Sequence, residues 1–228
     1  MFIGNLGCKA SLLLDGNELA VVGETKDLGV IVDSHLTFGA HIDQMVAKAF
    51  VRSNLIHKCF VSRDVSTLVR AFVVYVRPIL EYASCVWSPH HVGRIKQIES
   101  VQRRFTKRLP GYATLDYKSR LQRLGMDSLE MRRLRQDLIY TYKIVVDLVD
   151  GAANDMFTTS SNMYTTRGHM YKLFPHCSRL DMRKYFFAER VIQPWNALPA
   201  KHEHFRSRSA FARFVRCTDL SKFVINGF

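Results

Sequence analysis

Apolar and polar positions alternate at short range only near the N-terminus. Two short apolar runs, residues 12–14 and 19–22, flank Asp15-Gly16-Asn17. An Asp-Gly pair between apolar runs is a strong hairpin signal. A third apolar run, residues 28–32, follows the polar residues 24–27, which predict a turn. The pattern therefore predicts a β meander of three short strands.

Farther along the chain, apolar side chains recur every three to four residues, which is the spacing of amphipathic helices. Ile42, Met45, Val46 and Ala49, for example, share one face of a predicted helix. The period of such a face is 3.6 residues, whereas a half-buried strand has a period of two. The predicted helices cover residues 40–59, 65–77, 92–109, 117–124, 128–149 and 181–192, and a last helix, capped by Ser207 or Ser209, ends near residue 217.

Single residues set the predicted boundaries of these helices. Asp64 and Asp116 are predicted N-caps, because a short side-chain acceptor satisfies free N–H groups in a first turn. Gly125 is a predicted C-cap. Pro78 is expected to kink or end the helix that precedes it. Asp127, with a glutamate three residues on, resembles a capping box for the helix that follows.

The fold class predicted from these elements is mainly α. Gly, Ala, Asn, Ser and Thr dominate the stretch that begins at residue 150, which is typical of a linker or long loop. Within the region that follows, Pro194-Trp195-Asn196 predicts a rigid aromatic turn. The predicted organisation is a β meander at 1–36, a helical bundle at 37–150, a linker at 151–166 and a small C-terminal helical unit at 167–228.

The composition is that of a folded chain with a large positive net charge. Of 228 residues, 47% are hydrophobic and 23% are charged, which is typical of a folded protein. Lys plus Arg number 33 against 20 Asp plus Glu, a net charge of +13. The excess is concentrated in residues 94–143, which hold 13 basic and 5 acidic side chains. A localised basic region of this kind favours a polyanionic partner, most often nucleic acid.

Two groups of basic residues are the candidate binding sites. One surrounds the apolar stripe of the predicted helix 92–109, and the other lies in the first turns of the helix 128–149, where cations oppose the helix dipole and hint at an external anion. The alternative for the first group is an ordinary solvated helix face. The alternative for the second is pairing with Glu130 or Asp137 at helical spacing. The candidate nucleic-acid-binding residues are Arg94, Lys96, Arg103, Arg104, Lys107, Arg108, Arg132, Arg133 and Arg135.

The other residues that could carry chemistry favour structural roles. Asp33 with His35 and His41 could form an acid–base cluster, but a turn or cap role for Asp33 explains the pattern more simply. Trp87 and Trp195 could stack on bases, whereas core packing is the favoured interpretation.

Several classes of protein are not indicated. The histidines and the five cysteines fit no zinc spacing, and the sequence has no Gly-rich phosphate loop. No cofactor or metal is therefore expected in this chain. We also expect no membrane partner, because the sequence lacks a spanning segment and a secretory signal. The expected location is intracellular, nuclear or cytoplasmic.

Five blocks of residues, taken in order, carry a family resemblance. They are Lys26-Asp27-Leu28-Gly29-Val30 with Leu36, Phe38, His41 and Ile42; Arg77 to Pro89; Ile98 to Arg108; Ser128 to Leu138; and Arg167-Gly168-His169 with Phe186-Phe187 and Trp195-Asn196-x-Leu198-Pro199. Together they resemble the region that follows the palm in reverse transcriptases of non-LTR (LINE-type, jockey-like) retrotransposons. The blocks cover nearly the whole chain, and their order makes the resemblance specific.

The resemblance implies an RNA-directed DNA polymerase as the parent, with this chain as its thumb and C-terminal part. The helical bundle would then be thumb-like, and the chain is expected to begin inside the parent fold. Polymerases of this family hold two catalytic metal ions with an Asp-Asp motif in the palm. No Asp-Asp pair occurs in the 228 residues. We therefore expect no polymerase activity from this chain alone, and a divalent metal only in the palm of the parent.

The function implied is binding of an RNA/DNA template–primer duplex, which a thumb grips without performing nucleotidyl transfer. A further candidate partner is the fingers–palm part of the parent polymerase. The alternative is a non-catalytic relic, or a structural and interaction module, that retains no nucleic-acid binding. After Pro199 the sequence is rich in His and Arg and follows the family only loosely, so no role is transferred there.

Overall fold

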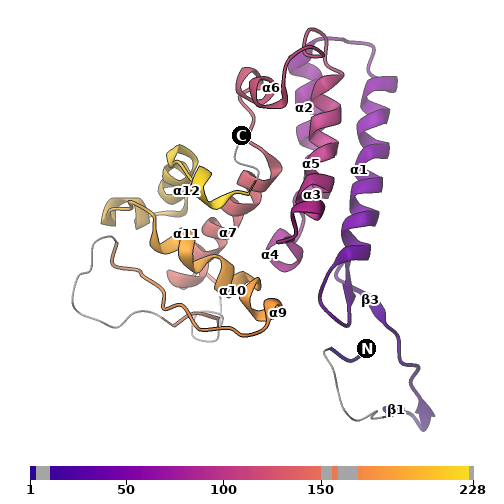
Figure 1. Cartoon of the computed structure of the whole chain (residues 1–228), viewed down its shortest axis with the longest axis vertical. Coiled ribbons are helices and arrows are strands. Elements are labelled where there is room, and N and C mark those ends of the chain that lie inside the picture. The colour runs from indigo at the N-terminus through magenta and orange to yellow at the C-terminus, as the bar shows by residue number, and fades with distance from the viewer. Residues whose placement is uncertain (4–10, 150–155, 159–168, 226–228) are drawn as a thin grey trace.

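A computed structural model shows that the chain is mainly α-helical, as predicted. It describes residues 1–3, 11–149, 156–158 and 169–225. The helices are α1 (Gly39–Cys59), α2 (Val65–Tyr75), α3 (Arg77–Glu81), α4 (Ser84–Trp87), α5 (Val92–Lys107), α6 (Tyr117–Leu124), α7 (Leu129–Val145), α9 (Asp181–Lys184), α10 (Phe187–Arg190), α11 (Ile192–Asn196) and α12 (Arg208–Cys217), with 3-10 turns η1 (His202–Phe205) and η2 (Ser221–Phe223). Figure 1 shows α1, α2, α3 and α5 forming one group of helices, and α7 with α9 to α12 forming the other.

The N-terminal strands form two separate hairpins rather than one meander, so that prediction was wrong in detail. The first hairpin pairs β1 (Leu13–Leu14) with β2 (Asn17–Glu18), around the predicted Asp-Gly turn. The second pairs β3 (Glu24–Asp27) with β4 (Val30–Asp33). Residues 24–27 are thus a strand, and the turn is Leu28-Gly29, with φ of 43° and 89°. Two consecutive positive φ values suit the tight turn of a two-residue hairpin, for which glycine is well adapted.

Most predicted helix boundaries are confirmed by capping contacts. The Asp64 carboxylate accepts the Thr67 N–H at 2.8 Å, and α6 begins after Asp116 and ends at Gly125, which is left-handed. Pro78 lies in the first turn of α3 and separates it from α2. The N-cap of α7 is Ser128 rather than Asp127, because the Asp127 carboxylate instead binds Arg135.

The C-terminal helices differ more from their prediction. The single helix expected at 181–192 is divided into α9 and α10, with α11 directly after them. Pro194-Trp195-Asn196, predicted as a turn, lies within α11. Proline is tolerated there because the first N–H groups of a helix have no intrahelical acceptor. The last helix, α12, has Ser207 as its N-cap, and the Ser207 hydroxyl accepts the Ala210 N–H at 3.2 Å.

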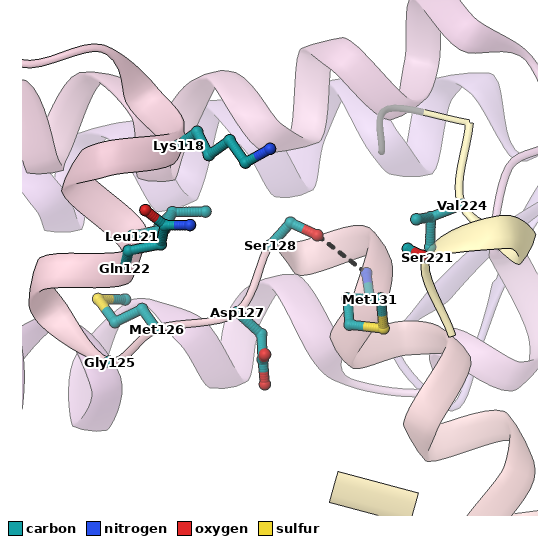
Figure 2. Close-up of a pocket in the computed structure, with 10 residues that line it drawn as sticks. All are labelled: Lys118, Leu121, Gln122, Gly125, Met126, Asp127, Ser128, Met131, Ser221 and Val224. Atoms are coloured by element: carbon teal, nitrogen blue, oxygen red, sulfur yellow. Dashed lines mark hydrogen bonds between the residues drawn. The ribbon is translucent and has the colours of Figure 1, made fainter. Parts of the chain in front are cut away.

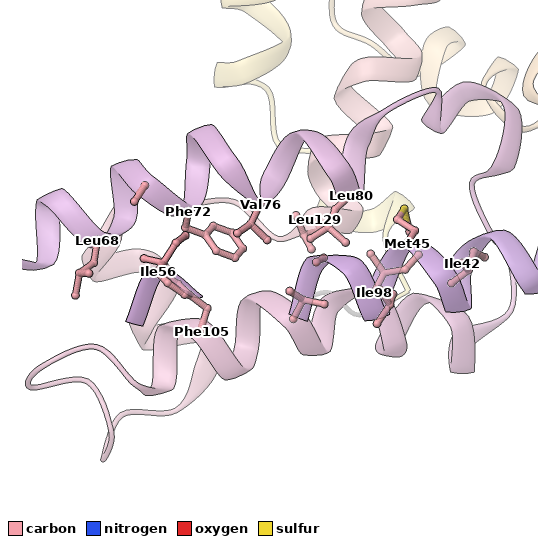
Figure 3. Packing of buried hydrophobic residues seen from close by; sticks show 14 of the residues in the cluster. Ile42, Met45, Ile56, Leu68, Phe72, Val76, Leu80, Ile98, Phe105 and Leu129 are labelled. Atoms are coloured by element: carbon pink, nitrogen blue, oxygen red, sulfur yellow. The ribbon is translucent and has the colours of Figure 1, made fainter. Parts of the chain in front are cut away.

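The first hydrophobic core lies among α1, α2, α3 and α5. Ile42, Phe72, Leu80, Ile98 and Phe105 are fully buried there. Figure 3 shows these side chains between the helices, and the rings of Phe72 and Phe105 stack with centroids 4.5 Å apart. Full burial of each such side chain stabilises the fold by roughly 1.5–3 kcal/mol.

The second core lies among α7, α10, α11 and α12, where Tyr142, Trp195 and Phe211 are buried. Helix α7 joins the two cores, since Leu129 packs in the first and Leu138 in the second. The cores therefore meet within α7. Of the predicted linker, residues 151–155 and 159–166 lie outside the described residues. The division of the chain into domains at the predicted positions stays a prediction.

Arg190 forms an ion pair within the second group of helices and also contacts α4, which follows the first group. Arg190 of α10 donates to both carboxylate oxygens of Asp137 in α7, at 3.0 and 3.3 Å. The same guanidinium donates to the backbone oxygen of Cys85 in α4, at 3.0 Å. Since α4 follows directly from α3, this contact orients the C-terminal unit with respect to the α1–α5 bundle.

Among the described residues, no helix is both long and apolar enough to cross a bilayer.

Candidate nucleic-acid interface

The outward face of α5 is strongly basic. Helix α5 is described throughout, and its acidic residue, Glu99, is 1% exposed on the inner face. Positions that point outward carry cations, so the charge of this face is positive along most of the helix. The exposed cations of this basic α5 face are Lys96, Arg103, Arg104, Lys107 and Arg108.

Neighbouring side chains hold several of these cations in place without cancelling their charge. Arg104 lies over the ring of Phe50, 5.7 Å from the centroid, and Arg108 donates to the amide oxygen of Asn54 at 2.7 Å. Both contacts join α5 to α1 at the same sequence separation of 54 residues, so the two helices run parallel here. Because these partners are neutral, the guanidinium charges remain available to an anion.

Arg94 differs from the rest of the α5 row, because it forms an ion pair. Its guanidinium binds Asp43 of α1 and donates to the Gln97 side-chain oxygen at 2.9 Å. Hydrogen bonds from Gln97 and from Arg94 lower the pKa of Asp43. Asp43 thus compensates the charge of Arg94 at the start of α5.

The basic surface extends onto α6, a predicted helix whose basic residues were not among the candidate binding residues. Arg103 lies over the ring of Tyr117, 4.8 Å from the centroid, so the two helices are in contact at this point. Lys118 and Arg123 of α6 are exposed. The sequence signal that could have found them is their position on the solvent side of a short helix that begins ten residues after Lys107.

A cleft of about 360 Å³ borders this surface at α6. Figure 2 shows Lys118, Leu121 and Gln122 of α6 on one side and Ser221 and Val224 on the other. The first turn of α7 lies between these two walls, where the Ser128 hydroxyl accepts the Met131 N–H at 3.1 Å. The walls of the cleft are polar at Lys118, Gln122 and Ser221, and Lys118 gives it a positive charge.

The second group of candidate residues faces carboxylates instead of solvent. Arg132 donates to both carboxylate oxygens of Glu81 in α3, and Arg135 binds Asp127. Arg133 is 2% exposed, and burial lowers its pKa. The carboxylates of Glu99, Glu130 and Asp137 oppose that shift. The structure therefore gives all three arginines acidic neighbours within the fold.

A buried polar network at the junction of α5, α6 and α7 explains much of this arrangement. The Leu129 N–H donates to the two carboxylate oxygens of Glu99, at 3.2 and 3.0 Å, and the Tyr117 hydroxyl donates to the same carboxylate. Gln102 donates to the Tyr117 hydroxyl at 3.0 Å and to the Asp127 backbone oxygen at 2.9 Å. Burial raises the pKa of Glu99. The network ties the start of α7 to α5, which is a structural role.

The residues whose role the sequence left open have structural contacts. Trp87 and Trp195 are 1% and 0% exposed, and each indole N–H donates to a backbone oxygen at 2.6 Å. The Asp33 carboxylate accepts backbone N–H groups of His35, Thr37 and Phe38 at 2.7–3.1 Å, which confirms its role in a turn. Within the described residues, no three His, Cys, Asp or Glu side chains are grouped as metal ligands.

Comparisons with known proteins give one distant similarity. An uncharacterized protein of Caenorhabditis elegans is 27% identical to this chain over 128 residues. The match covers 55% of this chain and 64% of that protein, so the chain spans less than two thirds of its relative. No family model matches the chain. No solved structure matches it at a significant level.

Proposed function

We propose that this chain binds double-stranded nucleic acid through its phosphate backbone, using the basic α5 face. The observation that supports the proposal is the row of exposed cations on α5, whose acidic residue is turned into the fold. A duplex carries about one negative charge per 1.7 Å of axis, and each neutralised phosphate releases counterions. Contacts of this kind position a protein on a duplex without reading its sequence.

The dimensions of α5 suit such a contact. Its 16 residues extend roughly 24 Å, and the cations recur along most of that length. If four or five of them each meet a phosphate, the logarithm of affinity falls with the logarithm of salt concentration with a slope of roughly −4. This slope is the quantitative signature that separates a binding face from a solvated helix surface.

We further propose that the chain acts as the thumb and C-terminal part of a retrotransposon reverse transcriptase. The support is the ordered series of sequence blocks. Several block residues have structural roles, because Glu99 and Ser128 cap the start of α7 and Asp137 holds Arg190. In this proposal the chain positions the template–primer duplex, and the chemistry belongs to a palm elsewhere in the parent.

Fluorescence anisotropy with a labelled RNA/DNA duplex, measured over a range of salt, tests the binding proposal. The variant Arg104→Gln with Lys107→Gln is expected to weaken binding at least tenfold and to reduce the slope by about 1.8. The matched control is Lys48→Gln with Arg52→Gln, which removes two exposed cations from α1. Phe50 marks the face of α1 that meets α5. Lys48 and Arg52 each lie two residues from Phe50, so their side chains point about 160° away from that face. Equal effects of the two pairs, or a flat salt response of the native chain, would contradict the proposal.

A second candidate function, docking onto another protein, has support at the N-terminal hairpins. Leu13, Leu14, Val21 and Leu28 are 62–85% exposed. Exposed apolar side chains concentrated in one short segment of the chain are typical of an interaction surface. The partner we propose is the fingers–palm part of the parent polymerase. Co-purification with that part, lost on Leu13→Ser with Leu28→Ser while duplex binding is kept, would distinguish docking from duplex binding.

A further inference from the structure

A pocket of about 400 Å³ opens where the two groups of helices meet, at the start of α5. Three segments wall it: the β4–α1 connection with Phe38, the α4–α5 region with Val86 and His90, and the α9–α10 region with Tyr185 and Phe186. A volume of this size lies within the range of small-molecule sites, which are concave and largely apolar with a few polar groups.

The walls of the pocket are aromatic and have a defined geometry. The imidazole of His90 and the ring of Tyr185 are stacked, with centroids 3.8 Å apart and planes 1° from parallel. This stack closes one side of the pocket between segments that are far apart in sequence. Burial lowers the pKa of His90, which favours the neutral, stacking form of its ring at pH 7. Aromatic walls select planar ring systems, since offset stacking is a favourable geometry for such rings.

The pocket lies at the end of the basic α5 row, and its own two arginines are paired with Asp43 and Asp137. Arg94 lines the pocket and also begins the α5 row that leads to the basic α5 face. Arg190 lies at the pocket as well, and Asp181 is the acidic side chain among its described lining residues. A polyanion lying along α5 would thus bring its backbone to the mouth of an aromatic pocket. Nucleic acid is the polyanion that carries planar rings beside its charges.

We propose that the pocket binds an unpaired nucleobase, with the strand attached to it leading onto the basic α5 face. The proposal deepens the proposed function and rests on it, because it takes the nucleic-acid strand to lie along α5. In the bound state, a base at a single-stranded end leaves the duplex stack and enters between Phe186 and the His90–Tyr185 pair. The shared chemistry is a heteroaromatic ring with a phosphate, which an overhanging strand or a free nucleotide can supply.

The test compares a short blunt duplex with the same duplex carrying a single-stranded extension that contains 2-aminopurine. The native chain is expected to bind the extended duplex roughly five- to tenfold more tightly, the effect of about one stacked base. The fluorescence of 2-aminopurine is expected to fall on binding. A third arm uses free 2-aminopurine nucleotide, which separates a mononucleotide site from a site that requires a strand.

Two matched variants place the effect in the pocket. Val86→Trp fills it from an exposed position, and Val74→Trp is the control, because Val74 on α2 is 54% exposed and Val86 is 52% exposed. We expect Val86→Trp to abolish the advantage of the extension without changing affinity for the blunt duplex, and Val74→Trp to change neither. Phe186→Ala, which removes one wall, is expected to have the effect of Val86→Trp.

The outcomes separate this inference from the proposed function. If both duplexes bind equally and still depend on the basic α5 face, the pocket assignment is overturned and duplex binding stands. If neither duplex binds but the free nucleotide does, in a manner sensitive to Val86→Trp, the pocket stands and duplex binding fails. Absence of binding in all three arms overturns both. An advantage of the extension that survives Val86→Trp and Phe186→Ala places the base elsewhere and overturns the pocket assignment.

Discussion

The basic α5 face and the first turns of α7 have similar compositions and opposite environments. Each carries arginines within a few residues. On α5, Arg104 and Arg108 contact a ring and an amide, both neutral. On α7, Arg132 and Arg135 bind carboxylates. The comparison teaches that the density of basic residues does not by itself locate a binding face.

Burial is the second difference between the two regions. Desolvation of a charge in a protein interior costs several kcal/mol unless opposite charges and hydrogen bonds compensate for it. Arg133 lies in such a site, near Glu99 and Asp137, which are themselves buried. Lys107, by contrast, remains exposed to solvent. The α7 arginines therefore contribute to the fold, and the α5 cations are those that a phosphate can reach.

The largest expected effect is on stability, and it tests this comparison directly. Arg133→Met removes the buried positive neighbour of Glu99, while Asp137 keeps Arg190, and is expected to lower the free energy of unfolding by about 3 kcal/mol. Arg104→Met, the matched change on α5, is expected to alter it by less than about 0.5 kcal/mol. Urea unfolding followed by circular dichroism measures both. Similar losses in the two variants would show that the regions do not differ as described.

The next effect is on salt dependence, with one cation removed from each region. Lys107→Gln is expected to reduce the salt slope of duplex affinity by about 0.9, because one phosphate contact is lost. Arg132→Gln is expected to leave the slope unchanged, since Glu81 holds that guanidinium. Anisotropy titrations at several salt concentrations, on protein shown to be folded, measure the slopes. A reduced slope in Arg132→Gln would return the α7 cluster to the binding face.

These two environments explain what the sequence could and could not predict. Helix ends were predicted well, because a cap is a contact within four residues, as between Asp64 and Thr67 or Ser207 and Ala210. Whether an arginine is paired within the fold or faces solvent depends on partners that are distant in sequence. Arg132 and Glu81 are 51 residues apart. Local spacing along the helix thus offers Glu130 and Asp137 as partners, whereas packing supplies Glu81.

Contacts between residues that are distant in sequence also decide which polar residues are buried and how the C-terminal helices are arranged. Glu99 has the sequence surroundings of a surface residue, between Ile98 and Ser100, and only the approach of Leu129 and Tyr117 buries it. The residues of the pocket at α5 come from three separate segments, so no local motif predicts it. Periodicity placed the apolar stripes, while their mutual arrangement required the tertiary structure.

The pH dependence of stability tests the buried network that ties the start of α7 to α5. Burial raises the pKa of Glu99 above its ordinary value of 4.5, so the folded state retains a proton that the unfolded chain releases. Stability is therefore expected to fall as pH rises from about 4.5 through the raised pKa. Glu99→Gln cannot ionise and is expected to flatten this decline. Asp137, whose pKa burial also raises, keeps part of it. Urea unfolding across this pH range measures the slopes, and identical slopes would contradict the assignment.

The smallest expected effect comes from removing the carboxylate that compensates the charge of one arginine. Asp43→Asn removes the carboxylate that pairs with Arg94 and leaves the Gln97 contact in place. An exposed ion pair contributes up to about 1 kcal/mol, so duplex affinity at low salt is expected to rise no more than about fivefold.

Asp147→Asn, which removes an exposed carboxylate just beyond α7, is the matched control and is expected to change affinity less. Titration at low and at high salt measures the gain, which should vanish at high salt because screening weakens exposed charges. An equal gain from both variants would mean that net charge, rather than the α5 row, determines binding. A gain confined to Asp43→Asn would place the phosphate contact at the start of α5, where the helix leads into the aromatic pocket.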